Sequence, residues 1–480
     1  MAEIQATCWL IADAREPLAK LVRQFADLRG VPVRLSPLCD GMLPSLPSTP
    51  GNLIAIAAES FERLAPSERK RVRSSVEGGA ILYLRDFKPG YHTLQPFADA
   101  RFLMIRERVF GYHLSTDNAI PKVLQNESSV ADVELCISDL SGTPATSLLS
   151  PEGSTDKEAV SIFAFRCGKG LAIYDLLPIA PVGDDPILFR FTDAAKQCAN
   201  LGPLVAIDSA TGRDNLPPAS FNLVIDDRPI SFDYFSRARL KRFLNHLEAC
   251  FPGVHVDFAW TPNQRHPSHR YVSTLKAFNC GFVWHGYLQH IDHNKIPSLT
   301  KELAAGKSEV RALSRRFGIS FQPVMIFPFE LSDYVVLSDL SHKGFLASVE
   351  RGDARPEYEC LLPGHLQYSS PALEIGKGFI PVLRRYPMKI LTRQMMLALA
   401  TLGYPIIAAA HPGDILLRRF VRPGASREAI HHFDALLNFA TEKCLSPCSL
   451  EQIAASLSPP LQSYSTKAPD FVRNAATHEV

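Results

Sequence analysis

The chain has 480 residues, of which 46% are apolar and 21% are charged, and its 51 lysines and arginines nearly balance its 49 aspartates and glutamates. A chain this apolar can bury a sizeable core, which excludes disorder as its main character. A formal net charge of +2 is too small to indicate binding of nucleic acid. No uncharged apolar run is long enough to span a membrane.

The amino terminus and the cysteines together predict a cytoplasmic protein. The first residues include an acid, Glu3, and no basic segment, so we expect no secretory signal. The ten cysteines are scattered without a CxxC pair, which favours reduced thiols over disulfides. Cys444 and Cys448 lie four residues apart, but no second close pair of ligands accompanies them, and we interpret them as structural.

The first two hundred residues alternate between strand and helix patterns. Helical spacing of apolar residues spans residues 18–28, and a second helix begins at Pro66 and is closed by Gly78 and Gly79. Short apolar runs typical of buried parallel strands occur at residues 8–13, 31–35, 52–57 and 80–86. This β-α-β alternation predicts a doubly wound α/β domain, to which we assign residues 1–212.

Residues 101–177 contain strand patterns separated by turns, and these either extend the same sheet or form a β-rich insertion. Residues 201–220 contain two glycines and three prolines, including Pro203, Pro217 and Pro218. That composition is typical of a linker between domains, although residues 204–208 also fit a short strand.

The second half, residues 219–480, repeats strand and helix units and predicts an irregular (β/α) barrel. Ser449 and Gln452 form a capping box that predicts the start of the last helix. Apolar runs typical of the barrel strands occupy residues 221–226, 254–260, 281–287, 321–328, 334–339, 378–385 and 405–411.

Polar residues follow three of these runs. Barrel enzymes place catalytic residues at the carboxyl ends of their strands. Asp226 and Asp227 end the first run, His411 ends the last, and His285 ends the GFVW run, with His290 and His293 beyond it. Two carboxylates and several imidazoles could hold a divalent metal and still supply an acid and a base.

With FNLVIDD, WHGYLQH and AAAHP in this order, the second half resembles the polysaccharide deacetylase superfamily of carbohydrate esterases. The resemblance implies a distorted (β/α) barrel that hydrolyses N-acetyl groups on amino sugars. It also implies that Asp226 is the general base and His411 the general acid. Asp227, His285 and a second histidine would be the metal ligands.

Two features depart from the family pattern. The family spaces its two histidine ligands four residues apart, but Gln289 stands at that position and His290 follows it. A loop or a one-residue bulge would be needed to bring His290 into the site, and His293 is a second candidate. The family's arginine beside prolines is not evident, because FQPVMIFPFE offers Pro323 and Pro328 without an arginine.

The resemblance implies a divalent metal, zinc, that polarises the amide carbonyl and activates a bound water. We expect Trp260, Tyr287 and Pro328 to contact the substrate, and Asp257 to lie near the barrel mouth. Without an export signal, the expected carbohydrate is an activated sugar, a glycolipid head group or another small glycoside or oligosaccharide.

The first half resembles, more loosely, class I glutamine amidotransferase-like domains, through its strand order and the segment CGKGLAIYDLLP. An active amidotransferase needs a cysteine on a sharp strand-to-helix turn. Cys167 instead leads into a strand, and Cys8 lies inside one. We therefore interpret this half as an accessory or substrate-recognition domain.

Two alternatives remain open. One is a barrel that has lost its metal and acts as a carbohydrate-binding or regulatory protein. The other is a metal-free glycoside hydrolase, which would need a second carboxylate about 5–10 Å from Asp226. The sequence leaves the oligomeric state open, including a homo-oligomer.

Overall fold

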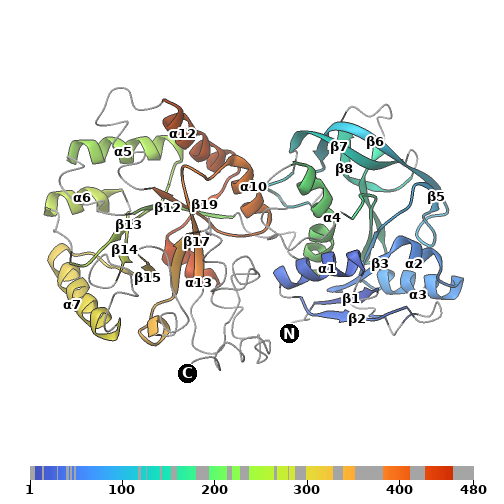
Figure 1. Cartoon of the computed structure of the whole chain (residues 1–480), viewed down its shortest axis with the longest axis horizontal. Coiled ribbons are helices and arrows are strands. Elements are labelled where there is room, and N and C mark those ends of the chain that lie inside the picture. The colour runs from blue at the N-terminus through green and yellow to red at the C-terminus, as the bar shows by residue number, and fades with distance from the viewer. Residues whose placement is uncertain are drawn as a thin grey trace, which may run out of the picture. The chain divides into compact units, whose positions relative to one another are not determined.

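The computed structural model describes residues 6–12, 16–29, 31–38, 43, 46–47, 50–116, 120–125, 127–140, 143–152, 159–179, 194–212, 219–226, 237–263, 268–278, 280–286, 299–327, 339–351, 382–410 and 427–457. The chain divides into two compact units, the first ending at Pro217 and the second beginning at Pro218 (Figure 1). Among the helices of these residues, none is long and apolar enough to cross a membrane.

The first unit is built on one mixed sheet with the order β2-β1-β3-β4-β11-β10-β8-β6-β7-β9, and β5 pairs with β6. Its parallel part is β2 (Val33–Leu35), β1 (Thr7–Ile11), β3 (Asn52–Ala57), β4 (Ile81–Arg85) and β11 (Gly170–Asp175). Its antiparallel part is β10 (Ile162–Cys167), β8 (Thr146–Glu152), β6 (Arg101–Leu114), β7 (Ser128–Asp139), β9 (Ala159–Val160) and β5 (Gly90–Thr93). The strand patterns after residue 101 therefore extend the same sheet.

Helices cover both faces of the parallel part. Leu82 and Tyr174 point into a core that includes side chains of α2 (Ala58–Glu62) and α3 (Pro66–Glu77). Asp175, the next residue after Tyr174, faces the opposite side, where α4 (Ala194–Thr211) passes over it. The mixed α/β class expected from the sequence is confirmed.

Helix α4 corrects the expected linker at residues 201–220. Its glycine is needed because a Cβ on Gly202 would lie 2.0 Å from the Asp175 Oδ2 atom. A buried ion pair also joins α4 to the end of α1 (Pro17–Leu28), with Arg29 Nε 2.6 Å from Asp208 Oδ1. Packing against the sheet thus overrides the helix-breaking tendency of Gly202 and Pro203.

The second unit contains a closed parallel barrel of seven described strands (Figure 1). In order around the barrel they are β12 (Ser220–Ile225), β13 (Val256–Trp260), β14 (Gly281–His285), β15 (Gln322–Ile326), β16 (Ala347–Arg351), β17 (Val382–Pro387) and β18 (Ile406–Ala410). Strand β12 pairs with both β13 and β18 and so closes the barrel. Strand β19 (Ser446–Pro447) pairs with the first two residues of β12.

The helices of this unit are α5 (Arg237–Cys250), α6 (His269–Ala277), α7 (Leu299–Phe317), α10 (Arg393–Thr401), α12 (Arg427–Glu442) and α13 (Leu450–Leu457). Strand β16 was missed from the sequence, because its second half, Glu350 and Arg351, is charged. The apolar run at residues 334–339 falls almost entirely outside the described residues.

Helix α13 closes the amino end of the barrel. Leu450 and Ile453 belong to the same buried cluster as the inward-facing strand residues. The predicted capping box is confirmed, with Gln452 N 3.1 Å from Ser449 Oγ and Ser449 N 2.8 Å from Gln452 Oε1. Asp257 accepts a hydrogen bond of 2.8 Å from Leu450 N, so it lies at this end and not near the mouth as expected.

Candidate functional site

Strand alternation brings three polar side chains together at the carboxyl end of the barrel. Val224, Val283 and Leu383 point into the barrel core, and successive inward residues on a strand lie two positions apart. Asp226, His285 and Arg385 each follow one of them by two residues. Their exposed fractions are 1%, 2% and 2%.

Asp226 lies between the other two residues. Its Oδ1 atom is 3.4 Å from His285 Nε2, and its Oδ2 atom accepts a short hydrogen bond from Arg385 Nη1. Its backbone N–H donates to Ala410 O at 2.9 Å, which holds Asp226 beside the end of β18. A carboxylate buried next to a guanidinium is stabilised in its ionised form.

The His285 ring is oriented by the neighbouring strand. Its Nδ1 atom is 3.3 Å from the carbonyl oxygen of Ile326 on β15, which also accepts a 2.9 Å hydrogen bond from Gly286 N. Nδ1 therefore lies against the Ile326 carbonyl, and Nε2 is directed toward Asp226 Oδ1. Metal-bound histidines are commonly oriented in this way, through the ring nitrogen that does not bind the metal.

Arg385 was not among the site residues expected from the sequence. The family's arginine was expected beside the prolines near β15, whereas Arg385 lies in the VLRRYP segment of β17. A guanidinium is long enough to reach Asp226 although β18 lies between β17 and β12 in the sheet. The alternation of side chains along β17 could have identified Arg385, because it places Arg385 inside the barrel and Arg384 outside. Arg384 Nη1 lies 3.2 Å from Glu350 Oε2 on the outer side.

Trp260 lies on the other side of its strand from the barrel interior. Ala259 points into the barrel core, so Trp260 points outward, and its ring packs against Phe282, Phe317 and Phe321 at centroid distances of 5.7–6.0 Å. With 1% of its surface exposed, it is in the environment of a core residue. Trp260 is therefore not part of the site proposed below.

Thr261 comes directly after β13 and follows the inward-facing Ala259 by two residues. Its side chain is 1% exposed, and its buried Oγ1 atom makes no hydrogen bond within the described residues. The sequence analysis did not select it, because one threonine after a strand carries little signal. The remaining predicted site residues, Asp227, Tyr287, His290, Pro328 and His411, as well as His293, fall outside the described residues.

The two cysteines considered in the first unit lie in strands. Cys8 belongs to β1, and burial raises the pKa of its thiol to about 12. Cys167 ends β10, a β-hairpin partner of β11, and burial raises its pKa as well. Because the thiolate is the nucleophilic form, these positions disfavour a role as nucleophile for either cysteine.

Comparison with known proteins supports the fold. No protein-family model and no curated protein sequence matches the chain. Its structure is similar to that of the carbohydrate deacetylase Agd3, with a TM-score of 0.61 and 10% identity over 94% of this chain and 87% of that one. At this identity the similarity establishes a shared fold.

A second solved structure is named as a candidate polysaccharide deacetylase from Mycobacterium smegmatis. It matches 53% of this chain and 96% of its own, with a TM-score of 0.35 and 15% identity. That score is too low to carry a structural argument.

Proposed function

We propose that this protein is a metal-dependent hydrolase that removes an N-acetyl or other N-acyl group from an amino sugar or a related glycoside. The observation that carries the proposal is the buried Asp226 carboxylate, held by Arg385 and facing His285 Nε2 at 3.4 Å. The fold shared with the carbohydrate deacetylase Agd3 supports a carbohydrate substrate.

The proposed metal ligands are Asp227, His285 and His290. The donor set suits a zinc ion, because catalytic zinc sites use imidazole and carboxylate ligands. His285 fits this role: the carbonyl of Ile326 fixes Nδ1, so that Nε2 is directed into the site. When bound, the metal would polarise the amide carbonyl and make a water molecule nucleophilic near neutral pH.

Asp226 is the proposed general base. The Arg385 guanidinium holds Oδ2, which directs Oδ1 toward the His285 side of the site. Asp226 would take a proton from the attacking water, and His411 would give one to the leaving amine. Ile407 on β18 points into the barrel core. The general-acid role requires that the strand's alternation of side chains continue, so that His411, four residues later, also points inward.

The wider assignment follows the same proposal. Tyr287 and Pro328 remain the proposed substrate contacts, and Thr261 joins them because its buried hydroxyl comes directly after β13, two residues beyond the inward-facing Ala259. Residues 1–212 would form the accessory domain and residues 219–480 the catalytic one. The substrate would be a small N-acylated glycoside or oligosaccharide in the cytoplasm.

Release of acetate from a panel of N-acetylated amino sugars tests this function. We expect zinc-loaded wild-type protein to hydrolyse at least one of them, a chelator to stop the reaction, and added zinc to restore it. Asp226→Asn should lower the rate by about 10²–10⁴-fold, because it removes the base. Its metal content should not change.

Two results would count against the proposal. One is an Asp226→Asn rate equal to that of wild type. The other is binding of the sugars by the zinc-loaded protein without any acetate release, which would favour a carbohydrate-binding barrel instead.

A further inference from the structure

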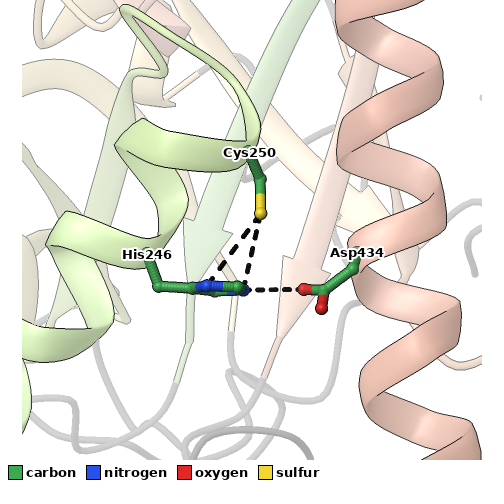
Figure 2. A group of neighbouring side chains, drawn as sticks. All are labelled: His246, Cys250 and Asp434. Atoms are coloured by element: carbon green, nitrogen blue, oxygen red, sulfur yellow. Dashed lines mark hydrogen bonds and ion pairs between the residues drawn. The ribbon is translucent and has the colours of Figure 1, made fainter.

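Three potential metal ligands meet outside the barrel, between helices α5 and α12. His246 and Cys250 come from successive turns of α5, and Asp434 comes from α12 (Figure 2). The side chains of His246 and Asp434 are 22% and 25% exposed, and Cys250 is partly buried. The one donor atom offered by each residue lies within 4.8 Å of the other two.

The thiol and the carboxylate approach the same ring nitrogen. His246 Nε2 is 2.7 Å from Asp434 Oδ1 and 3.5 Å from Cys250 Sγ, whereas Nδ1 is 4.0 Å from the sulfur. In a nucleophile relay, the nucleophile and the orienting carboxylate would contact opposite nitrogens of the imidazole. Here the three donors converge on one point, which is the arrangement of ligands around an ion.

We propose that His246, Cys250 and Asp434 bind a divalent cation of the zinc class. A thiolate with an imidazole selects zinc or cobalt over magnesium and calcium, which prefer oxygen ligands alone. Tetrahedral zinc–sulfur and zinc–nitrogen bonds place the two donors about 3.6 Å apart, close to the observed 3.5 Å. The Asp434 Oδ1 atom would move about 0.7 Å away from His246 Nε2, to the separation that oxygen and nitrogen ligands have in a tetrahedral zinc site.

Protons must leave the donor atoms for binding to occur. The Cys250 thiol releases its proton to solvent. The proton between His246 Nε2 and Asp434 Oδ1, which lie 2.7 Å apart, must leave as well, so that a neutral imidazole protonated on Nδ1 offers the Nε2 lone pair to the cation. Thiolate and carboxylate together neutralise the charge of the cation. Water would complete a tetrahedral shell, because the side chains are partly exposed.

The position of the site indicates a structural role. Helix α5 follows β12 in the chain, α12 follows β18, and these two strands are paired neighbours in the barrel. The helices already contact each other, since Thr441 Oγ1 donates to Cys250 O at 3.0 Å. A cation here would fasten the two helices that follow the strands leading to Asp226 and His411, and its ligands differ from those of the proposed catalytic metal.

Cobalt(II) titration of the full chain tests the proposal, because a thiolate ligand gives a cobalt charge-transfer absorption band in the near ultraviolet. The proposed catalytic ligands include no cysteine, so the band reports on this site alone. We expect a saturable band that is absent from Cys250→Ser and at least tenfold weaker in apparent affinity in Asp434→Asn. The matched control is Cys444→Ser, which removes an exposed cysteine at the end of the same helix pair and should leave the band unchanged.

A second measurement protects the test against a variant that fails to fold. In wild-type protein, zinc should slow alkylation of Cys250 by at least tenfold, measured by peptide mass spectrometry, and should leave Cys444 reactive. The proposal is overturned by the absence of a band in wild type, by a band that persists in Cys250→Ser, or by alkylation of Cys250 that zinc does not slow. None of these results depends on whether the barrel is a deacetylase.

Discussion

Arg384 and Arg385 are adjacent in the sequence, yet they lie on opposite faces of β17 and have different partners. Arg385 points into the barrel and binds the Asp226 carboxylate, whereas Arg384 points outward and binds Glu350. Both ion pairs are largely buried, so burial does not distinguish their roles. What distinguishes them is the face of the strand, which places only Arg385 beside the proposed general base.

This difference gives a residue-scale prediction. Arg385→Lys keeps the positive charge but loses the planar guanidinium that positions Asp226, so we expect its turnover to fall by at least tenfold. Arg384→Lys is the control, and it should retain turnover within a factor of two or so. Initial rates of acetate release at matched zinc loading, with circular dichroism to verify folding, make the comparison. Equal rates in the two variants would remove Arg385 from the site.

At the scale of elements, a buried polar network joins the amino ends of three barrel strands to helix α13. Asp257 on β13 accepts hydrogen bonds from Asn222 on β12 at 2.9 Å and from Gln322 on β15. Asp257 and Gln322 also accept the backbone N–H groups of Leu450 and Glu451, each at 2.8 Å. These N–H groups have no partner within the helix, so the network fixes the position of α13 in the barrel.

Gly281, the first residue of β14, leaves the space that this network occupies. A Cβ there would lie 1.9 Å from Asp257 Oδ1 and 2.2 Å from Gln322 Nε2. Gly281→Ala should therefore lower the free energy of unfolding by about 1–3 kcal/mol, measured by denaturant titration. The same substitution in an Asp257→Ser background should cost less, because the nearest clashing atom is gone. An equal cost in both backgrounds would show that the clash with Asp257 is not the cause.

At the scale of the whole molecule, the sequence predicted the α/β class because the apolar runs are short, separated by helical spacing and easily counted. It also predicted that Asp226 and His285 meet, since both end buried parallel strands of one barrel. It missed Arg385, because strand alternation places this side chain inside the barrel but does not show that it reaches past β18 to Asp226 at the end of β12. It missed α4, because the fit of Gly202 over Asp175 depends on tertiary packing.

The proposed function depends most on a metal ion at the carboxyl end of the barrel, and metal content after zinc loading and desalting is the direct test of that ion. Cys250→Ser is the appropriate parent protein, because it removes the proposed cation site between α5 and α12. We predict that plasma mass spectrometry finds a full equivalent of zinc in this parent and none in Cys250→Ser/Asp227→Ala. A parent that retains no divalent metal, or a double variant that retains as much as the parent, would rule out a barrel metal site built on Asp227.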